Sequence, residues 1–142
     1  FNGSIEKAFA PMSVTLTLED EIDISRGDMI ARPNNQPSVD QDIDIMICWI
    51  SEKPLIYKGK YAIKHTSKEA RCIVKEIKYK VDINSLHRLE KDKKIKCNDI
   101  ARISLRVTQP IFYDEYNTNR NTGSVILIDE GTHSTVGAGM II

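Results

Sequence analysis

The sequence contains little cysteine and no long apolar run. Only three of the 142 residues are cysteine, namely Cys48, Cys72 and Cys97, and they stand far apart without a C-x-x-C spacing. This pattern argues against a disulfide framework and favours a reducing, cytoplasmic environment. The longest unbroken apolar run covers residues 45–50. It is far shorter than the ~20 residues of a membrane-spanning helix, so we expect no membrane span.

The motifs that hold phosphates or activate a nucleophile are also missing. No G-x-x-x-x-G-K-[ST] loop, G-x-S-x-G elbow or H-E-x-x-H helix occurs in the sequence. The histidines His65, His87 and His133 are scattered singly, which argues against a metal site. The single G-x-G, at residues 137–139, has no helix after it and is typical of a terminal strand that packs closely. We therefore predict no catalytic, cofactor-binding or metal-ligating residue in this chain.

The charges are balanced in number but not in position. The chain has 20 basic and 20 acidic side chains, yet residues 1–50 carry a net charge of −6, residues 51–106 carry +9 and residues 107–142 carry −3. A basic middle could be a surface for nucleic acid or phosphate. It could also face an acidic part of the same molecule, or consist of solvated strand faces.

Apolar and polar residues alternate with a period of two over much of the chain, which predicts strands. The clearest instance is a set of four residues of one parity: Ile43, Ile45, Ile47 and Trp49. In residues 72–83, Lys78 and Lys80 have the parity opposite to the apolar residues. His65 has the parity of its apolar neighbours, so we expect a packed, hydrogen-bonded histidine. About eight short strands without a strand–helix–strand rhythm favour a small barrel or sandwich.

Two segments depart from this alternation. Residues 84–91 predict a short helix, with Asn84 or Ser85 as its N-cap and Leu86 and Leu89 on its apolar side. Residues 31–38 contain two prolines and no apolar run, and within them we place a linker at residues 34–37. Residues 1–33 offer at most three strands, including one over 13–18, which is too few for a core. We expect them to be the end of a domain that begins upstream, and residues 38–142 to form a second domain.

Four stretches carry a family resemblance: Ala10–Asp28, Glu76–Asn84, Thr122–Asp129 and Thr135–Ile141. In this order they resemble the large, GTP-hydrolysing subunit of bacterial sulfate adenylyltransferase, a member of the translation-factor-like GTPases. The resemblance extends over nearly the whole chain. Elongation factor Tu shares the domain plan, but its third domain lacks a sequence like Lys78-Tyr79-Lys80.

The resemblance implies an all-β fold. Residues 38–142 would form a closed, six-stranded antiparallel β-barrel like the third domain of elongation factor Tu. Residues 1–33 would be the last strands of the second-domain barrel. A GTPase domain that binds GTP and Mg²⁺ would lie upstream of Phe1, and in some organisms an adenylyl-sulfate kinase is fused downstream, which here would follow Ile142.

The resemblance also implies a role in sulfate assimilation in the cytoplasm. A small catalytic subunit would transfer the adenylyl group of ATP to sulfate, giving adenylyl sulfate and pyrophosphate, and GTP hydrolysis would drive this step. We expect the barrel region to be non-catalytic, to scaffold the assembly and to couple the two reactions. Lys78 and Lys80 are the predicted partner contacts, and the lysine-rich loop 88–96 is given no role.

Two other functions stay open at this point. The first is an RNA- or protein-binding barrel pair of a translation factor, which would use the basic middle segment, although we do not expect nucleic acid as the partner. The second is a stand-alone barrel with a ligand of its own. Phosphate-backbone binding would weaken steeply as salt rises, so salt dependence separates the RNA alternative from the others.

Overall fold

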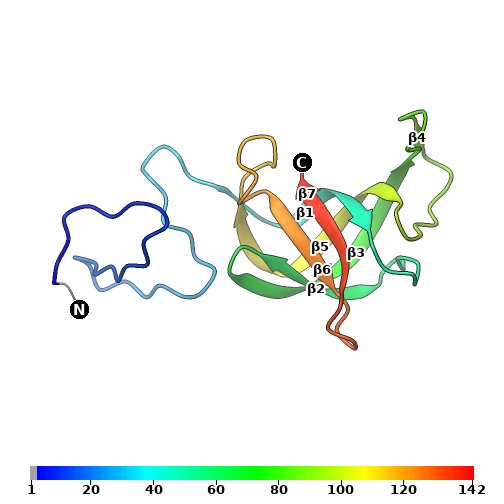
Figure 1. Cartoon of the computed structure of the whole chain (residues 1–142). Helices are drawn as coiled ribbons and strands as arrows, with labels where there is room; N and C mark the ends of the chain where they lie inside the picture. The colour runs from blue at the N-terminus through cyan, green and yellow to red at the C-terminus, as the bar shows by residue number, and fades with distance from the viewer. Residues whose placement is uncertain (1–2) are drawn as a thin grey trace.

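The computed structural model describes residues 3–142 and shows a closed β-barrel preceded by a looped segment without helix or strand (Figure 1). The strands are β1 (Ser38–Trp49), β2 (Lys60–His65), β3 (Lys68–Val81), β4 (Arg88–Leu89), β5 (Ile100–Tyr113), β6 (Ser124–Ile128) and β7 (Thr135–Ile141). All pairings are antiparallel, in the order β2-β6-β7-β1-β5-β3, and a pairing of β2 with β3 closes the ring. The predicted six-stranded barrel is therefore confirmed.

The predicted inward face of β1 is confirmed by its burial. Ile45 and Ile47 are fully buried, and Ile43 and Trp49 are nearly so. The Trp49 ring meets the Tyr61 ring edge-on at 5.5 Å, and its indole N–H donates to the carbonyl of Lys53 at 2.7 Å. Strands from all sides contribute to this core, so the barrel interior is filled by side chains.

The glycines of β7 explain how that strand fits beside β1. A Cβ on Gly137 would lie 2.7 Å from Cδ1 of Ile47, and one on Gly139 would lie 2.9 Å from Cδ1 of Ile45. Both distances are too short for real carbon contacts. The G-x-G is thus a packing feature of a terminal strand, as predicted.

The strand predicted over residues 13–18 is absent. Residues 3–37 contain no helix or strand, and Val14, Leu16 and Leu18 are exposed. A strand needs a neighbouring backbone to accept its hydrogen bonds, and no described segment lies beside these residues as a partner strand. The assignment of residues 1–33 to a preceding barrel stays a prediction, and Phe1 and Asn2 lie outside the described residues.

One turn of this first segment rests on the barrel. Arg26 Nε donates to the carbonyl of Ser67, in the β2–β3 turn, at 3.1 Å. Gly27 has a φ of +99°, and a Cβ there would lie 2.7 Å from Cβ of Lys68. Only glycine therefore fits this close approach to the β2–β3 turn.

The prediction of a helix over residues 84–91 was wrong. The segment instead forms a tight turn into β4, which pairs with the end of β3 through Lys80–Leu89 and Val81–Arg88. Asp82 starts the turn, because its carboxylate accepts the backbone N–H groups of Asn84 and Ser85. Short polar side chains compete with helical hydrogen bonds in this way and favour turns.

No helix that could cross a membrane occurs among residues 3–142.

Candidate functional site

The sequence-predicted contact residues Lys78 and Lys80 lie on the outside of β3, but neither ammonium group is free. Lys78 Nζ lies 2.6 Å from Oδ2 of Asp44, on β1. Lys80 Nζ lies 3.0 Å from Asp92 and 3.2 Å from Asp99. Both lysines thus belong to ion-pair clusters within the chain, whereas their role as partner contacts stays a prediction.

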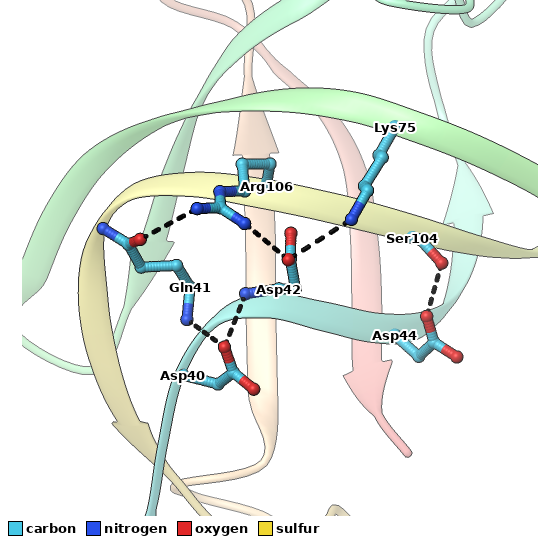
Figure 2. Close-up of polar contacts among 7 residues, drawn as sticks. All are labelled: Asp40, Gln41, Asp42, Asp44, Lys75, Ser104 and Arg106. Atoms are coloured by element: carbon cyan, nitrogen blue, oxygen red, sulfur yellow. Dashed lines mark hydrogen bonds and ion pairs between the residues drawn. The ribbon is translucent and has the colours of Figure 1, made fainter.

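The pairing of β1 with β5 is irregular near the start of β1. The register of β1 against β5 shifts between Asp40 and Asp42. Asp40 Oδ1 accepts the backbone N–H groups of Gln41 and Asp42, at 2.6 and 3.0 Å, which fixes the backbone of β1 at this point (Figure 2). These two bonds lower the pKa of the Asp40 carboxyl. Beyond this irregularity, Asp42 and Asp44 lie on the outer face of β1, and each contacts an arginine of β5.

Asp42 links three strands. Its Oδ2 lies 2.6 Å from the Arg106 guanidinium of β5 and 3.2 Å from Lys75 Nζ of β3, as Figure 2 shows. Arg106 also donates to the Gln41 side chain at 3.3 Å. Because β5 lies between β1 and β3, the lysine spans the full width of one strand. We call Asp42, Lys75 and Arg106 the Asp42 cluster.

Asp44, two residues further along β1, makes a similar set of contacts with β5 and β3. Its Oδ2 accepts from Lys78 of β3 and from Arg102 of β5, at 2.6 and 2.8 Å, and its Oδ1 accepts from the Ser104 hydroxyl. Burial opposes the charge of Asp44, but the hydrogen bonds from Lys78, Ser104 and Arg102 outweigh it and lower the pKa to about 2. Asp44 is therefore ionised at neutral pH. These four residues form the Asp44 cluster.

A third cluster lies at the far end of β3. The Lys80 side chain is only 16% exposed and contacts Asp92 and Asp99. The hydrogen bond with Asp92, helped by that with Asp99, raises the pKa of Lys80. Nearby, Lys93 Nζ donates to the carbonyls of Ile77 and Lys78. The loop 90–99 is thereby tied to β3.

These clusters account for part of the uneven charge distribution. Acidic residues of the N-terminal third, on β1, face basic residues of the middle segment, on β3 and β5. The sequence left three possibilities open for the basic segment. For this surface the structure shows the second one, in which opposite charges of one molecule face each other. The sequence signal was the spacing of Asp42 and Asp44, two residues apart on one strand, but only the strand order reveals their partners.

One histidine and one cysteine, His65 and Cys72, are used in packing. His65 is buried, and its Nε2 donates to the carbonyl of Thr122 at 2.6 Å, as expected for a packed histidine. Burial raises the pKa of the Cys72 thiol to about 12, so it is a poor nucleophile at neutral pH. No group of three or more metal-ligating side chains comes together in residues 3–142. What the arrangement provides is an outer surface on which charged contacts join β1, β5 and β3.

Comparisons with known proteins show which proteins this chain is similar to. A family model described as GTP-eEF1A C-terminal domain-like matches residues 42–142. The chain is 44% identical over 142 residues to the bifunctional enzyme CysN/CysC of Mycobacterium tuberculosis strain H37Rv, and this match covers 99% of this chain and 23% of that protein. It is 46% identical over 141 residues to sulfate adenylyltransferase subunit 1 of Shewanella woodyi, covering 99% of this chain and 30% of that protein. The chain thus spans less than a third of the length of these relatives.

A solved structure supports the fold independently. The crystal structure of sup35 complexed with GDP is similar with a TM-score of 0.68 and 14% identity, over 77% of this chain and 26% of that chain. At this identity the likeness concerns the fold alone. Together the matches confirm the resemblance to sulfate adenylyltransferase large subunits and to translation-factor-like GTPases. Because the family model covers most of the chain and the barrel agrees with it, the chain belongs to the GTP-eEF1A C-terminal domain-like family.

Proposed function

We propose that this chain is a non-catalytic barrel region of the large subunit of a sulfate adenylyltransferase. The observation that carries the proposal is the identity of 46% to a sulfate adenylyltransferase subunit over 99% of the chain. The whole enzyme would form adenylyl sulfate and pyrophosphate from ATP and sulfate, with GTP hydrolysis driving the step. The barrel would scaffold the assembly and relay the nucleotide state as a rigid-body movement.

The clusters support a mechanical role. A domain that transmits position must resist deformation, and the Asp42 and Asp44 clusters each join three neighbouring strands by charged contacts. The Asp44 cluster is partly buried, and charge-assisted hydrogen bonds in such surroundings hold a defined geometry better than the more exposed pairs of the Asp42 cluster. We infer that the outer face of β1, β5 and β3 keeps the barrel stiff while other parts of the subunit move.

GTP and Mg²⁺ are assigned to a GTPase domain elsewhere in the same subunit. The residues described here do not fit these ligands, because they contain no glycine-rich phosphate loop and the G-x-G of β7 packs against β1. The proposed partners are that GTPase domain and the small catalytic subunit. In some organisms an adenylyl-sulfate kinase would be fused to the same chain.

The test is to co-express the full-length subunit that contains this chain with a small subunit of sulfate adenylyltransferase. We expect a complex that forms adenylyl sulfate from ATP and sulfate at a rate that depends on GTP. A subunit that made no adenylyl sulfate, and instead bound RNA with a steep salt dependence, would favour the translation-factor alternative.

Lys78 and Lys80 are retained as proposed partner contacts. Because both are paired with carboxylates, a partner would have to share or displace Asp44, Asp92 or Asp99. Replacing both lysines by Gln in the full-length subunit should slow assembly with the small subunit, most clearly at low salt. The matched control is Lys64→Gln, which removes an exposed pair with Glu69. Equal association rates for both variants would reject the contact.

A further inference from the structure

The N-terminal segment is attached to the barrel at a second point, away from the covalent connection. The chain enters the barrel at Ser38, the first residue of β1. The turn at residues 25–28 instead meets the β2–β3 turn, where Arg26 Nε donates to the Ser67 carbonyl at 3.1 Å. In the described part of the chain, this is the only hydrogen bond between residues 3–37 and the barrel. The segment, at one end of the barrel in Figure 1, therefore has one covalent and one non-covalent attachment.

Gly27 lies directly on the Lys68 side chain. A Cβ at residue 27 would lie 2.7 Å from Cβ, 2.9 Å from Cγ and 3.0 Å from Cδ of Lys68. The backbone of the turn thus contacts most of the stem of the lysine, an approach that any larger residue would block. Because the φ of Gly27 is +99°, the position also requires a backbone conformation that is natural for glycine. The contact is therefore specific in shape.

The barrel holds its side of this contact firmly. Lys68 Nζ donates to the carbonyl of Pro110, on β5, at 3.0 Å and lies 6.0 Å from the centre of the Phe112 ring. His65, at the end of β2, is buried and bonds through Nε2 to the carbonyl of Thr122 at 2.6 Å. A force on the β2–β3 turn therefore acts on β5 and on the segment before β6.

The turn at residues 25–28 is closed by hydrogen bonds of its own. The Asp28 backbone N–H donates to the Ser25 carbonyl at 3.0 Å, and the Ser25 N–H donates to Oδ2 of Asp28 at 2.8 Å. Beside the contact lies a hollow of about 280 Å³, whose lining includes Asp28, Glu69 and Gln109. Two shaped turns thus meet over a small polar area, unlike the apolar packing inside the barrel.

Two attachment points restrict orientation where one does not. A covalent connection alone lets a segment pivot about the connecting residues, whereas a second contact leaves few orientations open. The connecting residues 29–37 are few and include Pro33 and Pro37. The two turns therefore stay close to each other, and a small contact is enough to hold them together. The position of the segment then determines the position of the barrel.

We propose that the turn at residues 25–28 and the β2–β3 turn form a joint through which movement in the rest of the subunit reaches the barrel. This inference deepens the proposed function and rests on it, since it names the contact that relays the nucleotide state as a rigid-body movement. Gly27 determines the fit of the joint, Arg26 adds the hydrogen bond, and Lys68 passes the movement on to β5. An intact joint keeps adenylyl sulfate formation tied to GTP hydrolysis.

Gly27→Ala tests the joint in the full-length subunit, assembled with a small subunit of sulfate adenylyltransferase. The added methyl group collides with Lys68, so the turn should leave the barrel. Amide hydrogen exchange over residues 25–28 should become faster. The adenylyl sulfate formed per GTP hydrolysed should fall about fivefold or more, as expected for the loss of an ordinary coupling free energy.

Two further variants separate the contact from strain within the turn. Arg26→Met removes the hydrogen bond to Ser67 without changing the backbone, and it should act in the same direction as Gly27→Ala but less strongly. The matched control is Gly3→Ala. Gly3 has a φ of +75°, but a Cβ there would meet none of the described atoms within 4 Å. This control should change neither the exchange over residues 25–28 nor the yield per GTP.

The outcomes separate the joint from the proposed function. Faster exchange and a lower yield per GTP in both Gly27→Ala and Arg26→Met, with Gly3→Ala unchanged, would support the joint. Unchanged exchange, an unchanged yield, or an effect of Gly27→Ala alone would overturn the joint and leave the proposed function standing. A wild-type complex that formed no adenylyl sulfate would overturn the proposed function and the relay with it.

Discussion

Lys78 of β3 and Asp44 of β1 are joined across the intervening strand β5, with 2.6 Å between Nζ and Oδ2. From the sequence, the polar face of β3 could be exposed to solvent only. In the fold, its Lys78 instead contacts β1, which is separated from β3 by one strand. It also makes the charge of Asp44 a contributor to stability, because Arg102 and Ser104 donate to the same carboxylate.

Asp44→Asn should destabilise the barrel at neutral pH and lose this effect in acid. The folded pKa of Asp44 is about 2, below its ordinary value of 3.8. Its stabilisation is therefore fully present above about pH 4–5 and is lost as pH falls toward 2. With solvent screening, we expect a difference of about 1 kcal/mol at pH 7. Urea unfolding of both proteins between pH 7 and pH 2 measures it, and a difference that grew in acid would contradict this account.

Trp49→Ala should be far more damaging than any change on the outer face of β3. The indole is almost completely buried and contacts Tyr61. Its removal should lower the free energy of unfolding by ~3–5 kcal/mol because the barrel cannot close the cavity. The control Lys78→Ala leaves Arg102 and Ser104 on Asp44 and should cost about 1 kcal/mol or less. Similar losses for both variants would mean that the two faces are assigned wrongly.

The alternation of side chains was enough to predict an all-β domain and the inward face of β1, because strands with one buried face need a period of two, whereas the closed six-stranded barrel was predicted from the family resemblance. It was not enough for residues 84–91, where Leu86 and Leu89 have helical spacing but the Asp82 carboxylate favours a turn. It also predicted a strand at residues 13–18, where the pattern is present but a partner strand is not. Local pattern specifies a strand only when a neighbour completes its hydrogen bonds.

The candidate surface was harder to predict than the fold. Lys78 and Lys80 were singled out correctly as outward-facing, but their partners are distant in sequence: Asp44 precedes Lys78 by 34 residues. Whether two such groups meet depends on the strand order β1-β5-β3, which the sequence does not display. The turn at Leu86, whose φ is +58°, was equally hidden, since the sign of φ follows from the turn and not from the residue type.

Gly137→Ala tests the packing of β7 against β1. A methyl group there would approach Cδ1 of Ile47 to 2.7 Å and Cε3 of Trp49 to 3.2 Å, and both neighbours are fixed in the core. We expect a loss of about 1–3 kcal/mol in the free energy of unfolding, as for other overpacked cores. Gly131→Ala is the control, because a Cβ there meets only a side-chain oxygen of Asp129 at 3.4 Å. A loss at Gly131 as large as at Gly137 would argue against overpacking.

The 142-residue chain alone should neither bind GTP nor form adenylyl sulfate. Its glycines serve in turns and in the β7 contact, its buried histidine is bonded to Thr122, and no phosphate-binding loop is present in the sequence. Calorimetric titration with GTP and Mg²⁺ should give no heat of binding, while the full-length subunit serves as the positive control. Micromolar binding of GTP to the isolated chain would contradict the assignment of nucleotide binding to another domain. It would then direct attention to the outer surface near Lys75 and Arg106, where a phosphate would have to compete with Asp42 for both cations.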